Sequence, residues 1–323
     1  MQARDGIDAS TSLAGALVTA LNERSFFQKG WETERVHLAR LFSAGEVERL
    51  FPMREFEELL TSGVLRSPHL DIVRNGQKEP APLLSSPSPA TDAGATLGAL
   101  AGGATLRGSH IEHYLPRVRA FCQCLERALQ MAMRVNVYAT PPFSQGFGPH
   151  FDLDDIFVVQ VAGEKSWILH TEYAAQEEAP NGDMPFDPMR HQAHGSPDCL
   201  RLGVGDVLYL PRGFMHEART GSSGSIHLTF AAIGTKLSEL VQQMVRALAV
   251  TDARLRRTLP VQGLSHEELL ATLQSEIRSC LDRLSDTDTL ELAIGAMQRS
   301  FASHRNPDLR GHLPNGLGLG RGA

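Results

Sequence analysis

The 323-residue sequence has few cysteines, no excess of positive charge and no long apolar run. Its four cysteines form neither a Cys-x-x-Cys pair nor a regular framework, which is typical of a reducing compartment, so we expect a cytoplasmic protein. A net charge of −6 argues against a general nucleic-acid binder, and we expect no direct nucleic-acid partner. No segment is apolar for long enough to cross a bilayer, so we expect no membrane partner.

A hydrophobic content of 42% is enough to bury one substantial core and a smaller second module. Composition and periodicity divide the chain into four parts. We expect an N-terminal mixed α/β segment, a β-rich core, a helical module and a flexible tail, with the boundaries 1–105, 106–235, 236–304 and 305–323.

The first part alternates between helical patterns and a loop composition. Leu13 to Leu21 has the pattern of an amphipathic helix, and Ser43 with Glu46 matches a capping box at the start of another. Residues Lys78 to Ala104 are rich in proline, serine, alanine and glycine, which predicts a mobile loop that could alternatively be a lid. A longer helix is predicted from Tyr114 to Met133 by its apolar spacing.

The segment from Arg134 to about Gly234 carries several short runs of alternating apolar residues separated by glycine and proline turns. This pattern predicts a mainly β fold, a double-sheet jelly roll, with flanking helices. The predicted strands are 135–138, 156–161, 166–169, 207–210 and 226–232.

Beyond Lys236 the apolar period becomes helical. Three stripes, beginning at Leu237, Leu269 and Leu290, predict three helices. The glycine-rich tail from Pro307 has too little apolar content to fold by itself.

The most informative motif is His150-Phe151-Asp152, followed much later by His216. In an extended strand, residues two apart point to the same side, so His150 and Asp152 could face one ion together. Two imidazoles and one carboxylate are the ligand set of non-haem Fe(II) oxygenases, whereas zinc more often takes a thiolate or a third histidine. A His-x-Asp pair alone is weak evidence, and its position between predicted strands and turns strengthens it.

Several spaced blocks, in the same order, closely resemble the JmjC ribosomal oxygenases, also called the cupin-4 family. The resemblance covers most of the chain. It is carried by residues 26–31, 136–152, 155–167, 205–218, 225–229 and 255–260.

This resemblance implies a JmjC double-stranded β-helix with Fe(II) held by His150, Asp152 and His216, and 2-oxoglutarate as co-substrate. Lys165 occupies the position whose basic side chain anchors the distal carboxylate of 2-oxoglutarate in the family. The resemblance also implies a homodimer formed through the C-terminal helices. Three further positions match the family, with two lining the 2-oxoglutarate pocket and one facing the substrate: Asn136, Thr229 and Tyr138.

Other histidines and lysines have simpler interpretations. Lys165 in a Gly-Glu-Lys turn could be a solvated hairpin lysine, and His227 could be a satisfied core histidine. His191 and His194, near Cys199, fit a zinc spacing poorly and are predicted to lie in a loop near the mouth of the barrel.

The chain departs from the family at two places. The family's ribosomal-protein hydroxylases carry a winged-helix module after the dimerisation helices, and we expect no room for one here. Ala231 stands where relatives can offer a serine toward the substrate. The sequence therefore supports the type of reaction better than it supports a particular substrate.

The leading hypothesis is an Fe(II)- and 2-oxoglutarate-dependent dioxygenase that hydroxylates an arginine or histidine side chain in a ribosomal protein or another polypeptide. A tailoring hydroxylase of a biosynthetic peptide or free amino acid is the alternative enzyme. A non-catalytic metal-binding cupin is the alternative from a different class. Lysine demethylation ranks lowest among the enzymatic hypotheses, because no aromatic cage is identifiable.

Overall fold

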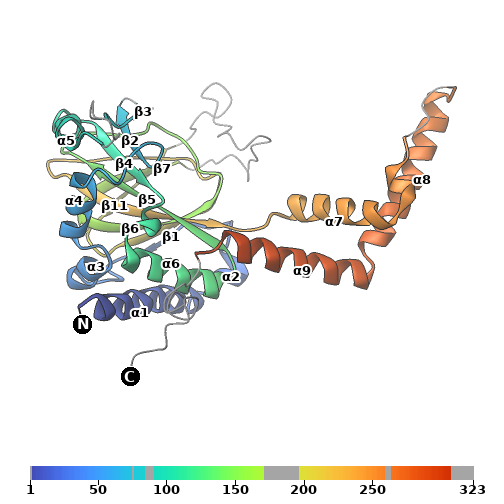
Figure 1. Cartoon of the computed structure of the whole chain (residues 1–323), viewed down its shortest axis with the longest axis horizontal. Coiled ribbons are helices and arrows are strands. Elements are labelled where there is room, and N and C mark those ends of the chain that lie inside the picture. Colours follow the sequence, from blue (N-terminus) through green and yellow to red (C-terminus); the bar gives the residue numbers. More distant parts are fainter. Residues whose placement is uncertain (1, 75, 84–90, 171–195, 259–262, 307–323) are drawn as a thin grey trace, which may run out of the picture. The chain divides into compact units, whose positions relative to one another are not determined.

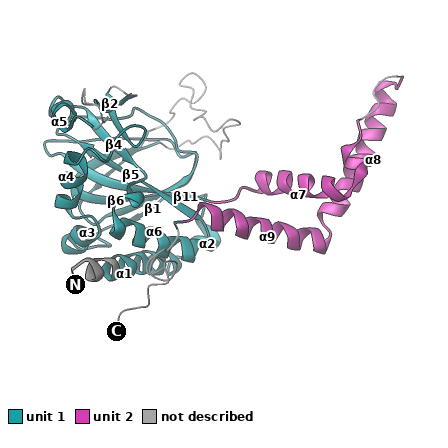
Figure 2. Cartoon of the chain, in the orientation of Figure 1, with its two compact units in different colours: residues 1–233, 306–323 teal, residues 234–305 magenta. Residues whose placement is uncertain are grey.

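The structure is a computed structural model, and it describes residues 2–74, 76–83, 91–170, 196–258 and 263–306. The chain divides into two compact units, one of residues 1–233 with 306–323 and one of residues 234–305 (Figure 2). The predicted boundary at residue 105, between an N-terminal segment and the β core, stays a prediction.

Two antiparallel sheets form the centre of the first unit (Figure 1). The larger sheet has the strand order β1-β9-β6-β11-β5-β4-β2-β3 and the smaller one β10-β7-β8. The mainly β, double-sheet jelly roll predicted from the sequence is confirmed. The strands are β1 (Val36–Leu38), β2 (Leu70–Arg74), β3 (Gln77–Pro80), β4 (Thr105–Ser109), β5 (Ala132–Thr140), β6 (Asp155–Gly163), β7 (Lys165–Leu169), β8 (Asp198–Leu202), β9 (Val207–Leu210), β10 (His216–Arg219) and β11 (Ser225–Ile233).

Alternation along the central strands separates two apolar clusters. On β6, Phe157 and Val159 belong to the cluster shared with the helices, whereas Ile156 and Val158 belong to the cluster shared with the smaller sheet. Because side chains alternate across a strand, one strand supplies both layers. The second layer includes Trp167 of β7, so the space between the two sheets is closed on one side by apolar packing.

Helices cover the outer face of the larger sheet. The capping box predicted at Ser43 and Glu46 is present, and the long predicted helix begins at Pro116 rather than Tyr114. Within this layer, the Phe121 ring lies 4.9 Å from that of Phe230 on β11. The helices are α1 (Gln2–Asn22), α2 (Phe26–Lys29), α3 (Ala44–Leu50), α4 (Met53–Thr61), α5 (Ala93–Ala101), the 3-10 turn η1 (Ile111–His113) and α6 (Pro116–Leu129).

The prediction of a mobile loop over residues 78–104 is wrong for much of this segment, because the segment contains most of β3 and all of α5. Asp92 caps α5 by accepting a hydrogen bond from the backbone N–H of Ala95 at 2.9 Å. The alanine and leucine content that suggested low complexity also favours a helix once a cap is present. Residues 84–90 lie outside the described residues.

The second unit is helical, as predicted. It comprises α7 (Leu237–Thr251), the 3-10 turn η2 (Ala253–Arg256), α8 (His266–Leu284) and α9 (Thr287–His304). Met244, Leu248 and Ala293 are buried within it. Many of its other large apolar side chains are exposed: Leu237, Val241, Val250, Leu270, Ile277, Leu281, Leu290, Leu292, Ile294 and Met297. Among the described residues, no helix is long and apolar enough to cross a membrane.

Candidate metal centre

His150 and His216 meet at the open end between the two sheets. Each donates its backbone N–H to the other's carbonyl, at N···O distances of 3.0 and 2.7 Å, in an isolated antiparallel bridge. His150 and Asp152 stand in the connection between β5 and β6, outside the regular strands. Pro149 has no N–H to donate, so the segment around His150 cannot form a continuous row of backbone hydrogen bonds with β10, and the two segments are joined by this one bridge.

The three predicted ligands nevertheless converge. Their candidate ligand atoms all lie within 4.8 Å of one another, and Asp152 Oδ2 is 3.7 Å from His216 Nε2. The backbone carbonyl of Asp152 accepts a hydrogen bond from the Gly213 N–H at 2.8 Å, which ties it to the turn before β10.

Both imidazoles are oriented by their own backbone. His150 Nδ1 lies 2.8 Å from the Gly148 carbonyl and His216 Nδ1 lies 2.9 Å from the Phe214 carbonyl, so each Nδ1 donates. In the neutral ring this leaves Nε2 with a free lone pair, which is how metal-binding histidines are usually oriented. Burial, followed by the neighbouring His150, lowers the pKa of His216 to about 4, so the ring is neutral at neutral pH.

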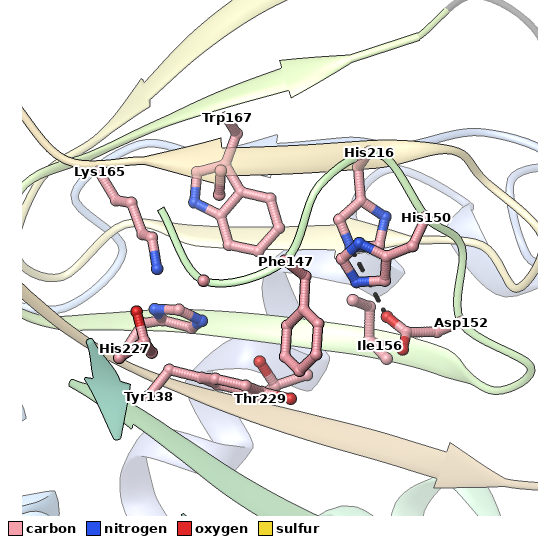
Figure 3. A pocket seen from close by; sticks show the side chains of 13 residues that line it. Tyr138, Phe147, His150, Asp152, Ile156, Lys165, Trp167, His216, His227 and Thr229 are labelled. Atoms are coloured by element: carbon pink, nitrogen blue, oxygen red, sulfur yellow. Dashed lines mark ion pairs between the residues drawn. The ribbon is translucent and has the colours of Figure 1, made fainter. Parts of the chain in front are cut away.

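A pocket extends from this cluster between the sheets and encloses about 490 Å³, counted out to its open mouth. The histidine and aspartate cluster lies at one end, and the Lys165 side chain reaches in at the other (Figure 3). The aromatic rings of Trp167, Phe147 and Tyr138 line the space between them. The full lining is Thr105, Tyr138, Gly146, Phe147, His150, Asp152, Ile156, Lys165, Trp167, His216, Ala218, His227 and Thr229.

Lys165 is buried, with 4% of its surface exposed, which argues against a solvated hairpin lysine. Its Nζ donates to Thr140 Oγ1 at 3.0 Å, and among the described residues no carboxylate forms an ion pair with it. Burial lowers the pKa of the Lys165 ammonium to about 7. An ammonium has three donors, so this site can satisfy an incoming anion.

Three buried polar atoms, one each on β5, β7 and β11, have no hydrogen-bond partner within the described part of the chain. They are Trp167 Nε1, His227 Nδ1 and Asn136 Oδ1. His227 is stacked on the Tyr138 ring at a centroid distance of 5.0 Å, and burial lowers its pKa well below the usual value. Buried polar atoms are normally paired, so the unpaired nitrogens of Trp167 and His227, which line the pocket, indicate a polar ligand there.

The structure brings most of the predicted site residues to the pocket. Tyr138 and Thr229 line it, together with Lys165 and the three candidate metal ligands. Asn136 does not line it, although it shares a strand face with Tyr138 and its Nδ2 lies 3.5 Å from the Tyr138 hydroxyl. His191 and His194 lie outside the described residues.

Sequence reasoning missed Thr140 and Trp167. Trp167 stands two residues after Lys165, and Thr140 stands two residues after Tyr138, so each shares the inward face of a predicted site residue. Period two along β5 and β7 was the available signal. Its use required knowing which face is inward.

Two aspartates next to the candidate ligands have structural partners. Asp154 forms an ion pair with Arg134 at 3.0 Å. Asp155 is buried and accepts a short hydrogen bond from the Tyr209 hydroxyl, and burial raises the Asp155 pKa to about 6.

A jelly roll with two histidines and one carboxylate at the mouth of an inter-sheet pocket defines a metal-site protein of the cupin class. Residues 111–240 match the JmjC domain family. This part of the chain is therefore similar to JmjC domains, in agreement with the sequence resemblance.

Similar proteins extend the likeness over most of the chain. The bifunctional lysine-specific demethylase and histidyl-hydroxylase NO66 of Drosophila sechellia is 28% identical, over 94% of this chain and 49% of that protein. Ribosomal oxygenase 2 of Rattus norvegicus is 26% identical, over 93% of this chain and 66% of that protein. The chain thus spans about half the length of the NO66 relative.

Among solved structures, the ribosomal oxygenase YcfD of Escherichia coli in complex with cobalt and 2-oxoglutarate matches with a TM-score of 0.53 and 15% identity. The match covers 86% of this chain and 71% of that one. A likeness at this identity shows the shared fold.

Proposed function

We propose that the protein is an Fe(II)- and 2-oxoglutarate-dependent oxygenase that hydroxylates an arginine or histidine side chain in a ribosomal protein or another polypeptide, releasing succinate and carbon dioxide. One observation carries this proposal. One pocket has a cluster of two histidines and one aspartate at one end and a buried lysine at the other (Figure 3). Among the described residues, this lysine has no acidic partner.

The donor set fits Fe(II). His150 Nε2, His216 Nε2 and the Asp152 carboxylate would hold the ion and leave coordination positions for co-substrate and oxygen. The carbonyls of Gly148 and Phe214 keep both imidazoles in the tautomer that binds metal. When bound, Fe(II) with 2-oxoglutarate supplies the oxidising chemistry, in which one atom of O₂ enters a substrate C–H bond and the other enters succinate.

The far end of the pocket fits a dicarboxylate. Lys165, oriented by Thr140, would pair with the distal carboxylate of 2-oxoglutarate. Both charged groups need a partner once water is excluded from the pocket. Thr229 and the unpaired Trp167 Nε1 supply further hydrogen-bonding groups in the pocket, and Asn136, outside the lining, contacts the Tyr138 hydroxyl. The proposal gains support from YcfD, whose structure contains cobalt and 2-oxoglutarate.

The remaining lining positions the reactants. Phe147, Ile156 and Trp167 form an apolar wall beside the candidate ligands and exclude water from the reacting centre. Tyr138 turns its ring into the pocket and is the residue we propose to contact the substrate. The polypeptide substrate class is supported by relatives that are named histidyl-hydroxylase and ribosomal oxygenase.

We further propose a cytoplasmic homodimer formed through the second unit. The exposed apolar side chains of α7, α8 and α9, such as Leu237, Ile277 and Leu292, need a partner to be buried. The four cysteines are free thiols, in keeping with a reducing compartment. Sedimentation of the full chain tests the assembly, and a monomer at all concentrations would contradict it.

Turnover of 2-oxoglutarate is the direct test of the enzyme proposal. The full chain with Fe(II) should convert 2-oxoglutarate to succinate, and His150→Ala should abolish this while His304→Ala, an exposed histidine on α9, should not. No succinate with any peptide or ribosomal protein, together with no iron binding, would favour the non-catalytic cupin. A mass increase of one oxygen atom on a ribosomal protein would favour the ribosomal substrate over a biosynthetic peptide or free amino acid.

A further inference from the structure

A second group of potential metal ligands lies outside the pocket, at the turn between β4 and α6. His110, Glu112 and His113 offer two imidazole nitrogens and a carboxylate oxygen, all within 4.8 Å of one another. We propose that these three residues form a second metal site, which takes a first-row divalent ion of the Zn²⁺ type. This proposal does not depend on the oxygenase function.

The spacing fits a shared ion better than direct hydrogen bonds. Glu112 Oε1 lies 3.3 Å from His110 Nδ1 and 3.7 Å from His113 Nε2. The first contact is long for a hydrogen bond and the second is too long to be one. Ligand atoms arranged tetrahedrally around an ion with bonds of about 2.0–2.1 Å lie about 3.3 Å apart.

Hydrogen bonds from the protein fix the orientation of the Glu112 carboxylate. Glu112 is buried, with 1% of its surface exposed, and its Oε2 accepts the backbone N–H of Val135 at 2.9 Å. The Arg119 guanidinium donates to the backbone carbonyls of Glu112 and His113, which fixes the turn itself. Such outer contacts orient a ligand and leave Oε1 directed at the two histidines.

The side chains of His110 and His113 are accessible to solvent, and their conformations are constrained. His110 and His113 are at least one-third exposed at the side chain, so an ion can reach them. Their rings are stacked at a centroid distance of 5.2 Å. His110 has a left-handed backbone, with φ of 56°, which turns the chain sharply at the start of η1 and is costly for a non-glycine residue.

A third imidazole, from a distant segment, joins the cluster. The His69 ring lies 5.2 Å from that of His110, and its backbone carbonyl accepts the Ser109 N–H at 2.8 Å. Its Nδ1 contacts the Tyr114 hydroxyl at 2.7 Å, which leaves Nε2 for another partner. His110, Glu112 and His113 supply three ligands of a zinc set, and His69 or water would be the fourth.

Zinc stoichiometry of the full chain tests the proposal once the first site is disabled. In a His150→Ala, His216→Ala background, equilibrium dialysis against Zn²⁺ should leave one equivalent bound. Adding His110→Asn and His113→Gln should remove it, since asparagine tolerates the left-handed backbone at position 110. The matched control adds His266→Gln and His304→Gln, two exposed histidines of the second unit, and should retain the equivalent.

A more conservative substitution distinguishes loss of zinc binding from loss of the fold. Glu112→Gln keeps an oxygen for the Val135 N–H but removes the anionic ligand, and it should weaken Zn²⁺ binding by about tenfold or more. Circular dichroism verifies that each variant is folded. No bound zinc in the disabled background, or equal zinc with and without the His110 and His113 substitutions, would overturn the second site.

Discussion

His150 and His216 join two distant segments through a pair of reciprocal backbone hydrogen bonds, while their side chains converge with Asp152. The bridge depends on backbone atoms only, and metal binding depends on side-chain atoms. Folding and metal binding at this site should therefore be separable by mutation.

The first prediction follows from that separation. His150→Ala should keep the thermal midpoint close to that of the native chain, because the bridge to His216 survives. Affinity for Fe(II), or for Co²⁺ as a probe, should fall by roughly a hundredfold or more, since loss of a ligand exceeds loss of a supporting contact. Metal titration followed by spectroscopy measures this, and undiminished affinity would remove His150 from the ligand set.

The second prediction concerns Lys165 and 2-oxoglutarate. Lys165→Ala should weaken 2-oxoglutarate binding by roughly 10- to 100-fold, the magnitude of a lost charge-assisted hydrogen bond. Metal affinity should be unchanged, since Lys165 lies at the opposite end of the pocket (Figure 3). Calorimetric titration measures both constants. Lys29→Ala, an exposed lysine, is the matched control, and equal co-substrate affinity in the two variants would refute the anchor.

The third prediction is a pH dependence. Burial lowers the pKa of Lys165 to about 7, and the groups facing it are Thr140 and the neutral His227. The carboxylate needs the protonated ammonium, so above pH 7 binding must take up a proton and affinity should fall by up to about tenfold per pH unit. Below pH 7 the lysine is already charged, and its contribution should level off.

The arginine variant is the control for this pH dependence. Lys165→Arg stays protonated throughout, so its 2-oxoglutarate affinity should vary much less between pH 7 and 9. Calorimetry over this range distinguishes the two chains. The same slope in both would assign the titration to another group.

The fourth prediction concerns Tyr209, whose hydroxyl donates to Asp155 and accepts the backbone N–H of Glu32 at 2.9 Å. Tyr209→Phe leaves a buried carboxyl and an N–H without this partner. The free energy of unfolding should fall by about 1–3 kcal/mol. Urea unfolding measures this loss, and an unchanged midpoint at constant slope would show that the hydroxyl contributes nothing to stability.

The central strands were predictable because they are long and alternate regularly. In β6 and β11 side chains alternate between two buried layers, in β5 they alternate between the larger apolar cluster and polar residues, and both patterns can be recognised in the sequence. The short strands β1, β2 and β4 have three to five residues each, too few for a period to emerge from mixed composition. The error over 78–104 arose because low complexity concealed a capped helix.

The candidate site was predictable as far as the motif extends. His150, Asp152, His216 and Lys165 were all identified from the residues and their family resemblance, and all four line one pocket. Thr140, the hydrogen-bond partner of Lys165, was missed because their contact joins residues 25 apart in the sequence. The contact of His69 with His110 was missed for the same reason, since these residues are 41 apart in the sequence.

The sequence by itself determined the chemistry that this protein can offer: which side chains can bind metal, where strands alternate and where the chain turns helical. These properties depend on residue type and local spacing. Only the tertiary structure decided that Lys165 is buried opposite the histidines, and that the His69 ring lies beside that of His110. Burial and proximity depend on strand register and sheet packing, which are set by contacts between residues far apart in the chain.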